Sequence, residues 1–272
     1  MSELREVVAG GDVLVLTGAG LSTASGIPDY RGPQGSLRRH TPMTHQAFTG
    51  SPEARQRYWA RSHLGWSRFG TASPNPGHLA VTALQDLGLL IGVVTQNVDG
   101  LHTAAGTRDV VDLHGRLDRV VCLDCGDVTA RDLLAARLAD TNTGWTARAG
   151  HLNPDGDVEL DDESGFTVVD CLRCGSVLKP DVVFFGGSVP RDLVEQTYAL
   201  ADRARALLVL GSSLQVMSGY RFALHAAKRG VPVVLVNQGE TRADHLAALK
   251  VEAPLQDVLP ALAKALAPAA IA

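Results

Sequence analysis

The sequence predicts an α/β protein with a doubly wound parallel sheet and a smaller inserted module. Two observations predict this fold: short apolar, β-branched runs alternate with helical patterns along the chain, and two segments interrupt that alternation. A length of 272 residues, 45% hydrophobic residues and a net charge of −4 are ordinary for a globular protein of about two structural units. This composition excludes disordered, collagen-like and coiled-coil classes.

The strands are expected where apolar runs show no polar alternation, because such strands are buried on both faces of a sheet. These runs are VLVLT (13–17), LIGVVT (90–95), ALLVLGSS (206–213) and PVVLVN (232–237). Helical patterns lie between them over 78–87, 191–205 and 220–229. Ligands bind beyond the carboxyl ends of parallel strands, and these ends carry the polar clusters TGAG, TQNVD, GSS and NQG.

Two interruptions of the alternation predict the small module. Segment 36–72 contains an expected helix over 52–68, and segment 116–180 contains all four cysteines. The sheet domain is then formed by 1–35, 73–115 and 181–272. Within the module, 151–164 has six acidic residues and no Lys or Arg, which is typical of a loop. The Ala-rich C-terminus predicts a helix followed by a frayed tail.

Net charge and targeting signals limit the classes of partner and the cellular location that we expect. The mild negative charge provides no basic field, so we expect no direct nucleic-acid partner. The opening MSELREVVAGG is too charged for a signal peptide, and no apolar stretch is suited to crossing a membrane. We therefore expect a cytoplasmic protein.

The turn Gly18-Ala19-Gly20 follows the first strand and predicts a phosphate site. Glycines let backbone N–H groups approach a pyrophosphate, and a following helix N-terminus favours negative charge. The match to G-x-G-x-x-G is incomplete, because Thr23 occupies the third glycine position. A tight turn without a ligand is the alternative.

The next motif, GIPDYRG, places Asp29, Tyr30 and Arg31 beside this turn. Such a loop has little packing purpose, and its aromatic ring is suited to covering a ligand ring. The alternative is a surface loop with a local Asp–Arg pair.

The motif TQNVDG places Gln96, Asn97 and Asp99 directly after an apolar strand. Their amides and carboxylate are suited to hydrogen bonds with ribose hydroxyls and a carboxamide. The alternative is helix capping by Asn97 or Asp99, although three polar groups exceed what a cap needs.

His114 precedes a glycine at the end of VVDLH and is a candidate general base, because its ordinary pKa lies near neutrality. A satisfied structural histidine is the alternative. His102, in DGLH, is the competing candidate, and we expect it to be structural.

The cysteines form the pattern C-x2-C-x45-C-x2-C, which supplies four thiolates for a closed tetrahedral Zn²⁺ shell. A closed shell predicts a structural ion that takes no part in chemistry. A pair of redox disulfides is the alternative, but no thioredoxin-like context accompanies the pattern. The ligands would be Cys122, Cys125, Cys171 and Cys174.

Two further runs are candidates for exposed sheet edges. KPDVVFFGG (179–187) is a short, apolar strand of the edge type, and GSSLQVMSGY (211–220) is an exposed run after a sheet strand. An extended peptide could add between them as a strand. Ordinary internal pairing is the alternative, and periodicity favours it.

In their order and spacing, these motifs resemble the sirtuins, which are NAD-dependent protein-lysine deacylases. The resemblance covers about residues 13–260 and rests on GAGLS, GIPDYRG, TQNVDGLH, HG, two C-x-x-C pairs, KPDVVFFG, GSSL and NQG. The segments GSSLQVMSGYRF, RQRYWAR and DGDVEL are most similar to the class II branch, whose members include weak deacetylases and ADP-ribosyltransferases.

The resemblance implies a Rossmann-type NAD domain and a zinc-ribbon and helical small domain, with the acyl-lysine entering between them. NAD is then the co-substrate and one zinc ion is structural. The pyrophosphate would lie on Gly18, Ala19, Gly20 and Ser22, and Asp29, Tyr30 and Arg31 would form the cofactor loop. Gln96, Asn97 and Asp99 would bind nicotinamide and its ribose, and the adenosine half would contact Gly211, Ser212, Ser213, Asn237, Gln238 and Gly239. The substrate peptide would contact Val182, Phe184 and Gly186.

The resemblance also implies the chemistry. With Asn97 and Asp99 fixing the nicotinamide ring, the acyl oxygen attacks ribose C1′ as nicotinamide leaves, and His114 then accepts a proton from the ribose hydroxyls. The products are free lysine, nicotinamide and 2′-O-acyl-ADP-ribose. Two alternatives remain: a protein mono-ADP-ribosyltransferase, which needs the same residues, and a silent NAD-sensing zinc-ribbon module, against which the complete residue set argues.

Some positions depart from the family pattern or bear on acyl choice. Gly187 replaces a common Glu, which puts peptide preference in doubt, whereas Tyr30 and Ser212 replace Phe and Thr without affecting the chemistry.

Tyr58 and Arg61 share one helix face, and in the branch that prefers dicarboxylic acyl groups such a pair binds the acyl carboxylate. The acidic segment 151–164 would oppose this preference. The alternative is that Arg61 is a solvated helix residue and Tyr58 is core.

Overall fold

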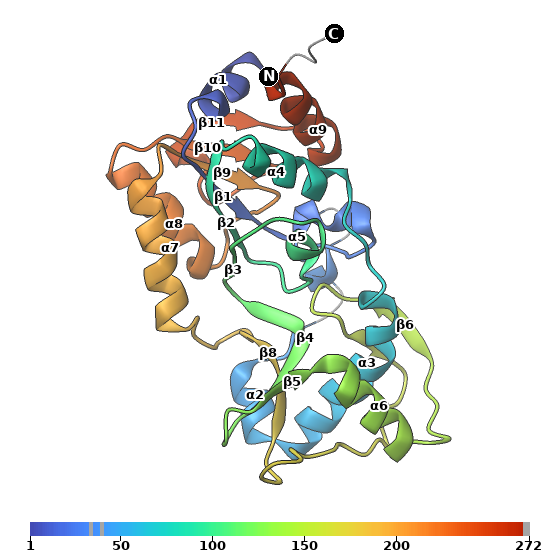
Figure 1. The fold of residues 1–272 in the computed structure, drawn as a ribbon. Coiled ribbons are helices and arrows are strands. Elements are labelled where there is room, and N and C mark those ends of the chain that lie inside the picture. Colours follow the sequence, from blue (N-terminus) through green and yellow to red (C-terminus); the bar gives the residue numbers. More distant parts are fainter. Residues whose placement is uncertain (33–34, 39–40, 269–272) are drawn as a thin grey trace.

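The computed structural model describes residues 1–32, 35–38 and 41–268. Its main body is a six-stranded sheet of order β11-β10-β9-β1-β2-β3, and all neighbouring strands are parallel (Figure 1). This arrangement confirms the predicted α/β fold class. The strands are β1 (Val13–Thr17), β2 (Leu90–Thr95), β3 (Val110–Asp112), β9 (Ala206–Leu210), β10 (Val233–Val236) and β11 (Ala247–Val251).

Helices cover both faces of this sheet, as a doubly wound fold requires. Side chains alternate along β1, so Val13 and Val15 pack on one side while Leu14 and Leu16 pack on the other. The first side is covered by α1 (Ser2–Ala9), α4 (Pro76–Asp86) and α9 (Leu255–Leu266), and the second by α7 (Arg191–Arg203) and α8 (Met217–Lys228).

Strand β11 and helix α1 of the sheet domain have no counterpart among the predicted elements. The edge strand β11 reads AALKV and carries a lysine and two alanines, so it lacks the continuous β-branched run of the central strands. Helix α1 lies in the charged opening segment, yet its Leu4 and Val8 are fully buried one turn apart. Helix α8 also begins earlier than expected, at Met217.

The smaller unit lies below the sheet domain in Figure 1. It contains α2 (His45–Gly50), α3 (Pro52–Phe69), α6 (Arg131–Thr141) and a three-stranded antiparallel sheet of β5 (Val128–Ala130), β4 (Gly115–Cys122) and β8 (Leu178–Val182). Ser51 caps α3 and Pro52 occupies its first turn, so the expected helix forms with the predicted start. The core of the small unit is aromatic, with Phe48, Tyr58 and Trp59 in edge-to-face contacts.

The acidic segment 151–164 contains regular structure, so its assignment as a loop is wrong. A hairpin of β6 (Ala149–Leu152) and β7 (Val158–Leu160) occupies its first part. The buried Asp157 carboxylate accepts a hydrogen bond from Asn153 at 2.7 Å and lies 3.3 Å from Arg61 Nε. The acidic composition therefore includes one buried, paired carboxylate as well as solvated ones.

The remaining elements are short. They are α5 (Leu101–Ala104) and four 3₁₀ turns at Ala19–Leu21, Thr23–Ser25, Ser36–Arg38 and Asp244–Leu246. Among the residues that the structure describes, no helix has the length and apolarity that a membrane span requires. The end of the expected frayed tail, 269–272, lies outside the described residues.

Candidate active site

The candidate site lies where β1 and β9 run side by side. Their connections leave in opposite directions, to β2 and to β10, which makes their carboxyl ends the switch point of the sheet. A cavity of about 1320 Å³ opens there. Nineteen of the predicted catalytic, cofactor and substrate residues line it: Gly18, Ala19, Gly20, Ser22, Asp29, Tyr30, Arg31, Gln96, Asn97, Asp99, His114, Phe184, Gly186, Gly211, Ser212, Ser213, Asn237, Gln238 and Gly239.

The glycine turn has a different local structure from the one expected. The N–H groups of Gly18 and Gly20 donate to the carbonyls of Leu210 and Gly211, at 3.0 and 2.9 Å, so β9 already uses them. A Cβ on Gly18 would lie 2.7 Å from the Ser212 Cβ. These glycines are therefore needed for close packing of the two strand ends. Short 3₁₀ turns follow instead of the expected helix N-terminus.

Asn97 and Asp99 are fixed by Ser22. The Asn97 amide donates to the Gly18 carbonyl at 3.1 Å and to Ser22 Oγ at 3.0 Å, and the Ser22 hydroxyl donates to Asp99 at 2.6 Å. The other Asp99 oxygen accepts from the N–H of Leu101, so Asp99 does contribute to the start of α5, but Asn97 does not. Burial raises the pKa of Asp99, and the Ser22 hydrogen bond opposes that shift.

The loop after the glycine turn lines the cavity with Asp29, Tyr30 and Arg31. Asp29 Oδ1 accepts from the Gly32 N–H at 2.7 Å, an Asx-type turn that shapes the loop. The Tyr30 ring meets the Phe185 ring edge to face, with centroids 5.7 Å apart. The loop that contains Tyr30 is thus in contact with the segment that follows β8.

His114 presents one ring nitrogen to the backbone and the other to a hydroxyl. Its Nδ1 lies 2.8 Å from the Gln96 carbonyl oxygen, and its Nε2 lies 2.8 Å from Ser218 Oγ. Burial lowers the pKa of His114, which favours the neutral, basic form of the ring. His102 lies elsewhere: it is buried, its Nε2 is 3.1 Å from Thr17 Oγ1, and its ring packs on His78.

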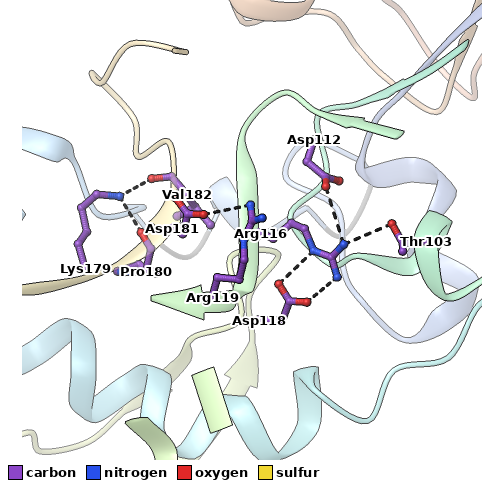
Figure 2. Close-up of polar contacts among 9 residues, drawn as sticks. All are labelled: Thr103, Asp112, Arg116, Asp118, Arg119, Lys179, Pro180, Asp181 and Val182. Atoms are coloured by element: carbon purple, nitrogen blue, oxygen red, sulfur yellow. Dashed lines mark hydrogen bonds and ion pairs between the residues drawn. The ribbon is translucent and has the colours of Figure 1, made fainter. Parts of the chain in front are cut away.

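The site lies between two units that are joined by charged side chains (Figure 2). Arg116 on β4 binds Asp118 and lies 3.9 Å from Asp112 on β3 and 3.3 Å from Thr103 on α5. Arg119 of β4 pairs with Asp181 of β8 at 3.0 Å. These contacts brace the strands that lead from His114 into the small unit.

The side chain of Lys179, near the start of β8, hydrogen-bonds to the backbone of its own strand. Its Nζ donates to the carbonyls of Pro180 and Val182, at 2.7 and 2.5 Å, as Figure 2 shows. Burial lowers the pKa of Lys179 to about 8. The lysine therefore supports the backbone that leads to Phe184 in the cavity wall.

Three predicted substrate residues lie away from this cavity. Val182 is buried at the end of β8, and the cavity wall begins at the next residue, Val183, after the strand has ended. Tyr58 and Arg61 line a separate cavity of about 400 Å³ beside α2. The Tyr58 side chain is buried in the core, as the alternative interpretation expected. That interpretation is wrong for Arg61, which is not solvated: its Nε donates to the Val158 carbonyl at 2.9 Å and pairs with Asp157.

The four cysteines form one cluster in the small unit. Their sulfur atoms all lie within 4.8 Å of one another, with Cys122 and Cys174 at 3.5 Å and Cys125 and Cys171 at 3.8 Å. Tetrahedral zinc with Zn–S bonds of about 2.3 Å places its sulfurs about 3.8 Å apart. The cluster therefore fits one structural zinc ion, with no position left open for a substrate.

The cavity also contains residues that sequence reasoning missed. Pro154 comes from the hairpin turn and Phe185 from the segment after β8, whereas Met217, Ser218 and Arg221 come from α8. The sequence pattern that could have indicated Ser218 is GSSLQVMSGY. Its serine residues follow a buried strand, as the polar residues of TQNVDG do. No local pattern marks Pro154, because the hairpin that positions it is itself not evident from the sequence.

Comparisons with known proteins show the family of this chain. The Sir2 family model matches residues 18–218. NAD-dependent protein deacetylase 1 of Streptomyces coelicolor is 57% identical over 265 residues, which is 97% of this chain and 89% of that protein. The human NAD-dependent protein lipoamidase sirtuin-4, mitochondrial, is 49% identical over 253 residues, 91% of this chain and 81% of that protein.

Solved structures give the same result. A Sir2 protein with a His-to-Ala substitution, bound to a deacetylated p53 peptide and 3′-O-acetyl-ADP-ribose, superposes with a TM-score of 0.81 at 29% identity, covering 97% of this chain and 98% of that one. A Sir2 complex with a p53 peptide and NAD⁺ superposes with a TM-score of 0.79 at 30% identity, over 97% and 98% of the two chains. With the family model matching well over half of its length, the chain belongs to the Sir2 family.

Proposed function

We propose that this protein is an NAD-dependent protein deacylase that removes acyl groups from lysine side chains. One observation carries the proposal: Asn97, Asp99 and a neutral, basic His114 line a single cavity at the switch point of a Rossmann-type sheet. Membership in the Sir2 family and relatives named as NAD-dependent deacetylases support it.

NAD would occupy the large cavity as co-substrate. Its pyrophosphate would lie near Ala19 and Ser22 under the loop of Asp29, Tyr30 and Arg31. Its adenosine half would lie against the polar ends of β9 and β10, which present Ser212, Ser213, Asn237, Gln238 and Gly239. The bound NAD supplies a ribose that loses nicotinamide and receives the acyl group.

The chain's own groups would orient the reactants and move one proton. Ser22 locks the Asn97 amide and the Asp99 carboxylate in place, so these groups need little reorganisation when they bind the nicotinamide ribose. His114 Nε2 would accept a proton from a ribose hydroxyl, and its Nδ1 hydrogen bond to Gln96 would stabilise the resulting imidazolium. Phe184 and Gly186 would contact the acyl-lysine segment.

An acyl-peptide panel tests the proposal. Peptides carrying acetyl-, lipoyl- and glutaryl-lysine are incubated with the protein, with and without NAD, and peptide masses are followed. Lipoyl is included because some relatives are named lipoamidases. Loss of an acyl group only when NAD is present supports the proposal, and an Asn97→Ala variant serves as the inactive control. Peptides that stay intact under all conditions would contradict it.

The binding partners and the cellular location of the protein are also proposed. The partners are proposed to be acylated lysine side chains of proteins, with no direct nucleic-acid partner, since the net charge of −4 provides no basic field. The location is proposed to be the cytoplasm, and fractionation of cells followed by immunodetection measures it.

A further inference from the structure

The basic nitrogen of His114 already has a hydrogen-bond partner. Because a carbonyl oxygen can only accept, the 2.8 Å contact with Gln96 means that Nδ1 carries the ring hydrogen. Nε2 then presents its lone pair to Ser218 Oγ at 2.8 Å, and the serine hydroxyl donates to it. The imidazole is thus held at both nitrogens, in the tautomer that leaves Nε2 basic.

Backbone geometry brings Ser218 to this position. The segment between β9 and α8 turns through Leu214, a buried non-glycine residue with a φ of 52°, before α8 begins at Met217. Ser218 therefore lies in the first turn of α8, at the end that faces the cavity. A left-handed residue at this point is typical of a segment whose path is fixed by its surroundings.

The next residue, Gly219, allows α8 to approach the site closely. A Cβ at Gly219 would lie 2.4 Å from the Gln96 side-chain oxygen, so a larger residue would have to displace the Gln96 side chain. The Gln96 amide in turn donates to Ser212 Oγ at 2.8 Å. Gln96 thus contacts α8 through its side chain and His114 through its carbonyl, and Ser218 completes this packed group.

We propose that Ser218 is a positioning residue for His114: its hydroxyl keeps the Nε2 lone pair directed into the cavity until a ribose hydroxyl of the co-substrate takes its place. In the reaction, the proton then moves from the ribose oxygen to Nε2, and Ser218 neither gains nor loses one. The proposal rests on the deacylase function proposed above and adds a residue that acts through the base.

The experiment separates two reactions of the enzyme. Exchange of labelled nicotinamide into NAD, in the presence of acyl peptide, requires the nicotinamide–ribose bond to break but requires no proton transfer to His114. Acyl transfer requires both. For Ser218→Ala we expect kcat of acyl transfer to fall about tenfold, in line with the loss of one buried hydrogen bond, while nicotinamide exchange stays within about twofold. Ser218→Thr, which keeps the hydroxyl, should retain most of the activity.

A double-mutant cycle assigns the effect to His114. In a His114→Ala background, Ser218→Ala should cause no further loss of acyl transfer, because the group that it positions is gone. Additive losses would overturn the proposal, and so would equal losses in exchange and transfer, which indicate a general structural defect. Full activity of Ser218→Ala would also overturn it. An ADP-ribosyl mass found on Ser218 would make this residue a nucleophile and would equally contradict the proposal.

A spectroscopic measurement is independent of turnover. In the free protein, ¹⁵N shifts of the His114 ring should show a protonated Nδ1 and a hydrogen-bonded, unprotonated Nε2, and Ser218→Ala should move the Nε2 signal. An unchanged Nε2 signal would overturn the inference even if the wild type is an active deacylase. If the wild type shows no NAD-dependent deacylation, the proposed function fails, while this measurement still decides the role of Ser218.

Discussion

His114 is the residue on which the proposed chemistry depends most. We expect His114→Ala to reduce deacylation by about 10²–10⁴-fold, the range that general bases contribute, while the protein stays folded and still binds NAD. Deacylation kinetics, a thermal melt and NAD titration test this together. Near-normal turnover would mean that another group is the base.

The pH profile of the wild type identifies the same group. Burial lowers the pKa of His114, so its neutral form persists below the ordinary value of about 6.5. The acid limb of kcat/KM should therefore lie below pH 6.5, with activity retained in mildly acidic solution. An acid limb above that value would contradict the assignment.

Arg61 is a residue whose role the structure revises. Its guanidinium is already paired with Asp157, and the two side chains are only 14% and 4% exposed. We therefore expect acetyl-lysine to be preferred over glutaryl-lysine, and Arg61→Met to leave that preference unchanged. The same change should lower the free energy of unfolding by about 3–5 kcal/mol, because it leaves a buried carboxylate without this partner.

Kinetics on both peptides and a denaturant titration check this expectation. The substitution Arg57→Met, on the same helix, is the matched control, because the Arg57 side chain lines the same small cavity without contributing to the Arg61–Asp157 ion pair. It should leave the free energy of unfolding nearly unchanged. A drop in glutaryl activity for Arg61→Met alone, with unchanged stability, would restore the carboxylate-binding hypothesis for Arg61.

At the scale of elements, the zinc cluster should stabilise the small unit without entering the chemistry. The cysteines tie the β4–β5 turn to the segment before β8, and β8 leads directly to the cavity wall. We expect one zinc per chain, and a lower melting temperature and solubility for Cys125→Ser before any change in active-site chemistry. Metal analysis and thermal melts measure this. A metal-free preparation of unchanged stability would contradict it.

The elements also show how far sequence patterns reach. The central strands were predictable because they are apolar on both faces, and their polar ends marked the cavity. The β6–β7 hairpin was not, because its Asp157 is paired with Arg61, which is distant in the chain and comes into contact only after folding. The glycine turn was found, but its packing against Ser212 depends on the order of β1 and β9 in the sheet.

For the whole molecule, buried histidines predict sensitivity to acid. Burial lowers the pKa of His78 to about 4 and that of His102 to about 3. The unfolded chain binds these protons from about pH 6.5 downward, whereas the folded protein does not until lower pH. The free energy of unfolding should therefore fall as the pH drops below 6.5, by up to about 1.4 kcal/mol per pH unit for each histidine.

Denaturant titrations between about pH 7 and pH 5 measure this slope. His102→Gln should flatten it, whereas His151→Gln, at an exposed position, should leave it unchanged. A stability that does not vary over this range, or that varies equally in both variants, would show that the buried pair is not the cause.

In the proposed reaction, the acyl group passes from lysine to the ribose of NAD. The direct measurement is the stoichiometry of products from an acetyl-lysine peptide and NAD, read by mass spectrometry. We expect equal amounts of deacetylated peptide, nicotinamide and O-acetyl-ADP-ribose. Free acetate formed without loss of NAD, or ADP-ribose attached to protein with the acetyl group left on lysine, would contradict it.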